Sequence, residues 1–330
     1  MANQPGSFES VSIGFAHPQF DDKSNHQKHP ANYHQQKVPR LPNTIKAFFD
    51  PRMSCPSGGY SPSGEKPAAV FADWLEQNLI EPMSFEPVSH DDLCLAHSTE
   101  YVEGVFSGKT NNGHGNKNLD VAESTRWTVG SMVAAAREAV RSRVACSPSS
   151  GFHHACYGSG GGFCTFNGLI VASRKLLAEG LVNRVGILDC DWHYGDGTDD
   201  IIQRLKLASD IMHHTSGAQS LRDSDHYFSW LDSAITQLQE AKVDLILYQA
   251  GADAHINDPL GGLLNKEELS QRDSTVFERC CHDKIPIAWN LAGGYQKAAD
   301  GSIHKVIEIH RETMRQCNRV FDQGLKTDEH

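Results

Sequence analysis

Short apolar runs, each followed at once by polar residues and glycine, recur through the second half of the chain. Residues 185–188, 243–250 and 285–291 are such runs, and segments with helical periodicity separate them. A short apolar run bounded by turn residues is typical of a strand buried on both faces. The alternation predicts an α/β fold of three layers, with a mostly parallel central sheet covered by helices on both faces.

Helical periodicity is clearest over residues 120–143, where Asp120 is the expected N-cap. Asn167 or Thr165 is the expected cap of a helix that ends at Gly180. Further helices are expected over 41–49, 68–78, 97–107, 198–207, 228–239, 265–283 and 302–321, and short strands over 11–16, 144–146 and 210–212.

The length of 330 residues and the 39% hydrophobic share are ample for one α/β domain. We expect a single domain over residues 1–330, in which 1–40 forms a polar N-terminal arm or loop. The arm carries several histidines, and two interpretations stay open: a solvated loop, or a loop that folds over a substrate entrance or a neighbouring subunit. These histidines are His17, His26, His29 and His34.

The formal net charge of −11 argues against nucleic acid and anionic membranes as main partners, and it suits cationic substrates. Nine cysteines without a CxxC pair fit a reducing compartment. The first ten residues lack the features of a signal peptide, and no apolar run approaches the roughly 18 residues of a membrane span. We expect a cytoplasmic protein, and a homo-oligomer is compatible with the sequence.

Acidic side chains and a histidine follow the apolar run 185–188 at every second position. They are Asp189, Asp191 and His193, and on an extended chain such residues share one face. Two acids and an imidazole on one face after a buried strand cost several kcal/mol per uncompensated charge. A metal ion removes that cost. The competing interpretation, a loop with helix caps, explains this spacing less well.

Asp253 follows the apolar run 243–250, and the carboxyl ends of parallel strands meet at one edge of a sheet. Asp191, His193 and Asp253 would supply the three protein ligands that a catalytic zinc commonly has. Fe²⁺ or Mn²⁺ could replace zinc with these ligands. As an alternative, Asp253 could cap a turn.

Two adjacent histidines, His153 and His154, lie in a segment rich in glycine and serine and are candidate general acids and bases. Asp189 and Asp196 are candidate hydrogen-bond partners for imidazoles. Tyr295 follows two glycines and is a candidate donor to an oxyanion. Together with a metal, these groups describe the hydrolysis of an amide.

Six segments occur in an order typical of one known family: 97–102 (HSTEYV), 151–155 (GFHHA), 161–167 (GGFCTFN), 189–198 (DCDWHYGDGT), 251–261 (GADAHINDPLG) and 292–295 (AGGY). With these segments the chain resembles the zinc-dependent histone deacetylase superfamily, which includes acetylpolyamine amidohydrolases and acetoin-utilisation proteins. The resemblance implies the arginase–deacetylase α/β fold. It also implies zinc ligands, a tandem histidine pair with carboxylate partners, and a transition-state tyrosine at the residues assigned above.

The resemblance adds Gly162 and Phe163 as the lining of an acyl-lysine tunnel, and a monovalent cation, usually potassium, near Asp189. The chain departs from the family at its rim. Tyr194, which we interpret as a packing residue, stands where a second histidine is common, and no proline-glycine segment follows His213-His214. The substrate therefore stays open between acyl-lysine in a peptide, an acylpolyamine and a related small amide or metabolite.

We predict a zinc-dependent amidohydrolase that removes an acetyl or other short acyl group from an amine. An arginase-like hydrolase with two metal ions is an alternative, but Asp258, which precedes a proline, fits a second metal poorly. A non-catalytic module that binds acyl-lysine or metal is another alternative. Binding alone does not require the histidine pair or Tyr295.

Overall fold

The computed structural model describes residues 44–56 and 61–327. The predicted N-terminal arm, its histidines and the predicted strand over 11–16 lie outside these residues. Within them, seven strands form one sheet in the order β2-β1-β3-β7-β6-β4-β5, and every neighbouring pair is parallel. The strands are β1 (Ile45–Phe48), β2 (Ile80–Met83), β3 (Val144–Ser150), β4 (Val185–Asp189), β5 (Ile211–Thr215), β6 (Leu245–Gln249) and β7 (Ile287–Ala292).

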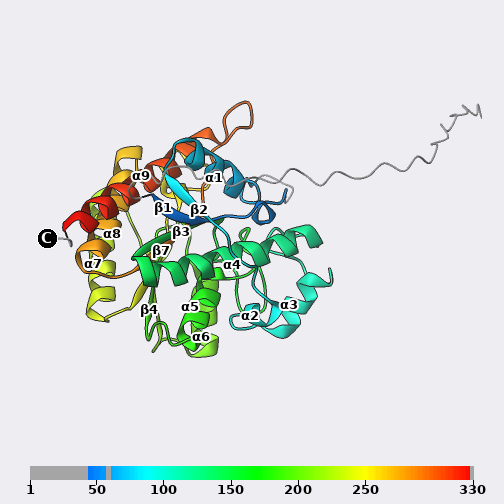
Figure 1. Cartoon of the computed structure of the whole chain (residues 1–330). Helices are drawn as coiled ribbons and strands as arrows, with labels where there is room; N and C mark the ends of the chain where they lie inside the picture. Colours follow the sequence, from blue (N-terminus) through cyan, green and yellow to red (C-terminus); the bar gives the residue numbers. More distant parts are fainter. Residues whose placement is uncertain (1–43, 57–60, 328–330) are drawn as a thin grey trace, which may run out of the picture. The chain divides into compact units, whose positions relative to one another are not determined.

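Helices cover both faces of the sheet, as the alternation of patterns predicts. Figure 1 shows α4 running along one face near α5 and α6, whereas α1, α7, α8 and α9 belong to the other. The helices described are α1 (Lys66–Glu76), α2 (His90–Leu93), α3 (Thr99–Phe106), α4 (Leu119–Ser142), α5 (Gly168–Ala178), α6 (Asp196–Leu205), α7 (Ser224–Glu240), α8 (Lys266–His282) and α9 (His304–Thr327), with short 3-10 turns at Pro51–Met53, Ser216–Ala218 and Ala252–Ala254.

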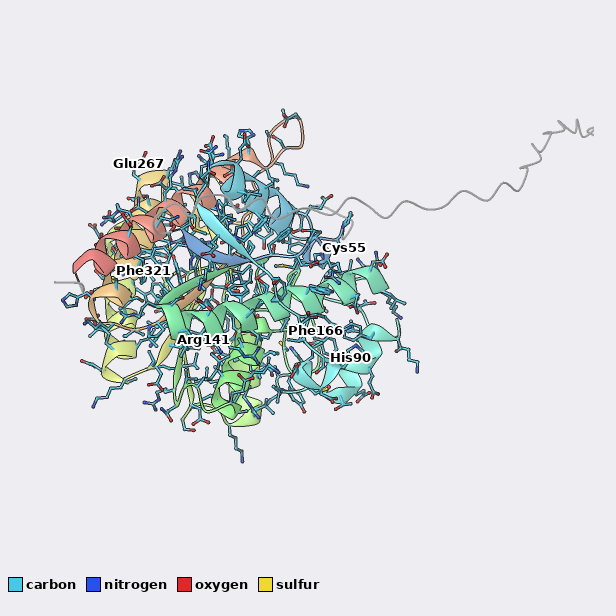
Figure 2. All side chains as sticks on the ribbon, viewed as in Figure 1. Cys55, His90, Arg141, Phe166, Glu267 and Phe321 are labelled. Atoms are coloured by element: carbon cyan, nitrogen blue, oxygen red, sulfur yellow. The ribbon has the colours of Figure 1, made fainter. Side chains whose placement is uncertain are left out.

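Side chains of the central strands alternate between two apolar cores. In β6, Leu245 and Leu247 join the cluster under α4 and α5, whereas Ile246 and Tyr248 join the cluster under α7, α8 and α9. Figure 2 shows the side chains that fill both layers, with Phe321 labelled on α9. A strand buried on both faces needs apolar residues in both directions, which explains the continuous runs in the sequence.

Four neighbouring strands, β3, β7, β6 and β4, carry the predicted site residues just beyond their carboxyl ends. In a parallel sheet, these ends form the ligand-binding edge. No helix in the described part of the chain has the length and apolar character that crossing a bilayer requires.

Two predictions about single elements are wrong. The segment predicted as a helix over 41–49 contains strand β1, and β2 was not predicted. Strand β1 lies between β2 and β3, so pairing in the sheet overrides the local helical pattern of a short segment. Asn118, not Asp120, caps α4: its side chain accepts a hydrogen bond from the backbone N–H of Asp120. Asn167 caps α5, as predicted.

Candidate active site

The three predicted metal ligands meet at the carboxyl ends of β4 and β6. One ligating atom of each of Asp191, His193 and Asp253 lies within 4.8 Å of the others. The His193 Nδ1 atom is 3.1 Å from Asp191 Oδ1 and 2.9 Å from Asp253 Oδ2. Both carboxylates are buried, and His193 is partly exposed. Two acids and one imidazole therefore face a common point.

This group of side chains fits a bound cation. The hydrogen bonds to Asp191 and Asp253 raise the pKa of His193 to about 11, because a positive charge between two carboxylates is strongly favoured. Burial, with the nearby charge of Asp191, raises the pKa of Asp253 to about 7. The backbone at Gly293 also approaches the two carboxylates closely: a Cβ atom on Gly293 would lie 2.3 Å from Asp253 Oδ2 and 2.7 Å from Asp191 Oδ2.

Both predicted histidines form pairs with the predicted carboxylates. His153 Nδ1 is 2.7 Å from Asp189 Oδ2, and His154 Nδ1 is 2.7 Å from Asp196 Oδ1. The two imidazole rings are 4.1 Å apart between centroids. His153 Nε2 lies 3.6 Å from Asp191 Oδ1, so this ring is directed toward the group of metal ligands.

The surroundings of His153 and His154 shift their pKa values in opposite directions. Burial favours neutral His153, but the charges of Asp189 and Asp191 dominate and raise its pKa to about 9. Burial lowers the pKa of His154, and the neighbouring His153 lowers it further, so that Asp196 only partly offsets the shift. Adjacent groups with opposed shifts are suited to separate acid and base roles.

Tyr295 lies beside this group at the end of β7. Its ring centroid is 6.4 Å from that of His193 and 5.7 Å from that of Phe163. Its backbone N–H donates to Asp258 Oδ2 over 2.8 Å, which anchors the turn. Burial and the charges of Asp191 and Asp253 raise the pKa of the phenol, so it stays protonated and can donate a hydrogen bond.

Gly162 lies against the His154 ring, and the Phe163 ring lies beside that of Tyr295. A Cβ atom on Gly162 would lie 2.3 Å from His154 Cδ2, so glycine is needed for the close approach. Phe163 has a φ angle of 66°, in the left-handed region that costs energy for a bulky residue. Its N–H donates to Gly113 O over 3.0 Å, which helps to hold this conformation. The Phe163 ring is tilted against the His114 ring, with the two ring centroids 5.7 Å apart.

Other polar residues around the site were not predicted. Gln249 at the end of β6 donates to Asp189 Oδ1 over 2.8 Å and accepts from the Phe152 N–H over 2.9 Å. It therefore links the end of β4 to the segment that follows β3. Lys66 is fully buried and donates to Ala292 O. Burial lowers the pKa of Lys66 to about 8 against the attraction of Asp253 and Asp191. The polar Gln249 at the end of an apolar run was the available sequence signal.

The interpretation of Tyr194 as a packing residue is wrong. Tyr194 is 42% exposed, and its hydroxyl donates to Asp199 Oδ2 over 2.6 Å. Tyr194 is directed toward solvent and is not part of the group of candidate metal ligands. Asp258, considered for a second metal, accepts hydrogen bonds from the backbone N–H groups of Leu260 and Tyr295 instead.

Comparisons with known proteins agree with this geometry. Residues 65–217 and 218–310 match the profile of the histone deacetylase domain. An uncharacterised protein of Picosynechococcus sp. is 30% identical over 271 residues, which cover 75% of this chain and 89% of that protein. Histone deacetylase 2 of Arabidopsis thaliana is 26% identical over 273 residues, which cover 71% of this chain and 67% of that protein.

Solved structures share the fold. The acetylpolyamine aminohydrolase from Burkholderia pseudomallei superposes with a TM-score of 0.68 at 15% identity, over 84% of this chain and 99% of that one. The HD domain of HDA15 superposes with a TM-score of 0.68 at 18% identity, over 87% of this chain and 92% of that one. These likenesses confirm the predicted deacetylase-type fold.

Proposed function

The chain belongs to the histone deacetylase family, and from this premise we propose that it is a zinc-dependent amidohydrolase. It removes an acetyl or other short acyl group from an amine. The observation that carries this proposal is the position of the Asp191, His193 and Asp253 group directly beside two imidazole–carboxylate pairs. A site that only bound metal would not need the second set of groups.

Asp191, His193 and Asp253 hold the metal ion in this proposal. Three protein ligands leave a position open, and nitrogen with carboxylate oxygen suits Zn²⁺, with Fe²⁺ as the replacement. When bound, the ion polarises the acyl carbonyl and lowers the pKa of water. The buried Gln249 and the Gly293 N–H, which donates to Asp191 Oδ2 over 2.8 Å, hold the surrounding acids in place.

The side chains divide the proton transfers between them. His154, whose pKa is lowered, accepts a proton from the attacking water and passes it to the leaving amine. His153, paired with the buried Asp189, keeps its proton and stabilises negative charge nearby. The Tyr295 hydroxyl donates to the oxyanion that develops on the carbonyl oxygen.

The substrate is an acylated amine: a lysine in a peptide, a polyamine or a small metabolite. Phe163 and Gly162 flank the acyl chain at the opening in this proposal. The net charge of −11 favours approach of a cationic amine. A potassium ion near Asp189 remains a prediction from the family resemblance.

The alternatives have less support. An arginase-like reaction needs a second set of acidic ligands, but among the described residues the candidate metal ligands that meet are Asp191, His193 and Asp253, and Asp258 is not part of this group. A module that only binds acyl-lysine or metal would not need the imidazole–carboxylate pairs of His153 and His154.

Turnover of two matched substrates tests the proposal most simply. An acetyl-lysine peptide and an acetylated polyamine are supplied to protein whose zinc content is measured in the same sample. Release of acetate from either, with about one zinc per chain, is the expected result. Zinc-loaded protein that hydrolyses neither these substrates nor their longer-acyl counterparts would refute the proposed reaction.

A further inference from the structure

A third buried imidazole, that of His213, lies behind the histidine pair. His213 belongs to β5 and pairs in register with Ile187 of β4. Because paired residues point to the same face and alternate residues share a face, the His213 and Asp189 side chains project to the same side of the sheet. The His213 side chain is only 2% exposed.

His213 lies between two carboxylates. Its Nδ1 atom is 2.8 Å from Asp199 Oδ1, and its Nε2 atom is 3.6 Å from Asp189 Oδ2. That same Asp189 oxygen is 2.7 Å from His153 Nδ1. One carboxylate oxygen therefore has an imidazole on each side: one from the histidine pair and one from β5.

The Asp189 carboxylate and the His213 ring are packed closely against Gly195. A Cβ atom on Gly195 would lie 2.7 Å from Asp189 Oδ2 and 2.9 Å from His213 Cε1. The His213 Nε2 atom is buried and has no hydrogen-bond partner among the described residues, so Asp189 is the acceptor that it faces. A buried polar atom without a partner is costly, which favours an N–H directed at this carboxylate.

The charges around His213 favour a proton on each ring nitrogen. Burial alone lowers the pKa of His213, but Asp189 and Asp199 raise it above its ordinary value. Asp199 comes from α6 and is 42% exposed. It also accepts a hydrogen bond from the Tyr194 hydroxyl. His214, the next residue along β5, has a pKa that is lowered by burial and by the charge of His213.

We propose that His213 is a positioning residue for the reaction: it holds Asp189 against His153 and ties this pair to Asp199 at the surface. This inference rests on the proposed function. Asp189 Oδ1 is fixed by Gln249, so His213 completes the support by fixing Oδ2. The orientation of His153 then depends on both β5 and β6. Partners that support active-site ligands in this way are worth about 10- to 100-fold in activity.

Two amide substitutions separate the two contacts of His213. The amide nitrogen of His213→Gln takes the place of Nε2 and can donate to Asp189, whereas that of His213→Asn takes the place of Nδ1 and faces Asp199. We expect His213→Gln to keep kcat within about threefold of wild type, and His213→Asn to lower kcat about 10- to 100-fold, with KM unchanged in both. Equal kcat values in the two variants, whether high or low, would overturn the proposal.

His226→Gln is the matched control, because His226 forms a similar pair with Asp223 over 2.7 Å on the surface of α7. It should leave kcat unchanged. Asp199→Asn tests the outer contact without altering a buried residue. It should lower kcat no more than His213→Gln does, within about threefold of wild type, and have no further effect in His213→Gln, where the contact between residue 213 and Asp199 is already lost. Equal losses in both backgrounds would contradict the link.

A spectroscopic measurement separates this inference from the proposed reaction. The imidazole N–H proton shared between His153 and Asp189 should give a low-field NMR signal in the zinc-loaded protein. We expect the signal to move in His213→Asn and to stay in place in His213→Gln. If wild type hydrolyses no acyl amide, the proposed function fails, but this shift still supports positioning by His213. An unchanged signal in both variants would overturn it.

Discussion

Tyr295 is the side chain whose chemistry can be separated most cleanly from metal binding. Its hydroxyl is kept protonated by burial and by the charges of Asp191 and Asp253. It lies beside the metal ligands, with its ring centroid 6.4 Å from that of His193. Removing the hydroxyl therefore removes a hydrogen-bond donor and leaves the ligands in place.

Tyr295→Phe should lower kcat about 100- to 1000-fold, the usual cost of one oxyanion donor. Zinc content, measured by elemental analysis, should stay at the wild-type value. The assigned role would be untenable if turnover were unchanged, or if zinc were lost in parallel.

At the scale of the elements, the turn after β7 leaves no space for a side chain beside the candidate metal ligands. A Cβ atom on Gly293 would collide with the carboxylates of Asp253 and Asp191, at 2.3 Å and 2.7 Å from their Oδ2 atoms. Gly293→Ala should therefore displace two ligands and weaken zinc binding about 10- to 100-fold, measured by titration with a competing chelator.

Gly158→Ala is the control for this substitution, because a Cβ atom there meets nothing within 4 Å. It should bind zinc like wild type. Equal zinc affinity in the Gly293 and Gly158 variants would show that the turn does not shape the metal site.

The strands that could be predicted are those buried on both faces. Continuous apolar runs identified β4, β6 and β7, and the polar residues after them predicted the candidate metal ligands that the structure brings together. The 41–49 segment was predicted as a helix because its pattern is short and ambiguous, and only pairing with β2 and β3 makes it a strand. Gln249 and His213 were missed as site residues because their partners depend on register between strands.

At the scale of the whole molecule, the sequence predicted that the carboxyl ends of the strands that carry the site meet. It did not predict the order of the strands in the sheet or the buried polar groups next to the site. The four strands that carry the site are neighbours in the sheet but are not consecutive in the sequence, and their order follows from crossovers that no local pattern records. The buried Lys66 illustrates this, since it contacts Ala292 across 226 residues of sequence. Contacts between residues so far apart in the sequence cannot be predicted from a local pattern and are seen only in the structure.

Acid sensitivity of the whole fold should arise partly at His97. This buried ring is hydrogen-bonded as a neutral imidazole, with Nδ1 2.9 Å from Cys156 O and Nε2 accepting from the Asn167 N–H. Burial lowers its pKa from 6.5 to about 4. The unfolded chain binds the proton first, so stability is lost as the pH falls from 6.5 to about 4.

This titration should remove about 3 kcal/mol of unfolding free energy across that range, measured by urea unfolding at several pH values. His97→Asn keeps a donor toward Cys156 O and has no group that titrates there. Its loss of stability on acidification should be smaller by about the same amount. Parallel pH profiles for the two proteins would exclude His97 as the cause.

The central claim is that one metal ion, held by Asp191, His193 and Asp253, is required for amide hydrolysis. The most direct test removes metal with a chelator, restores zinc stepwise, and measures bound zinc and deacylation in the same samples. Turnover should rise in proportion to zinc and level off at about one ion per chain, and His193→Ala should recover neither. Full turnover by metal-free protein, or full zinc retention by His193→Ala, would contradict the claim.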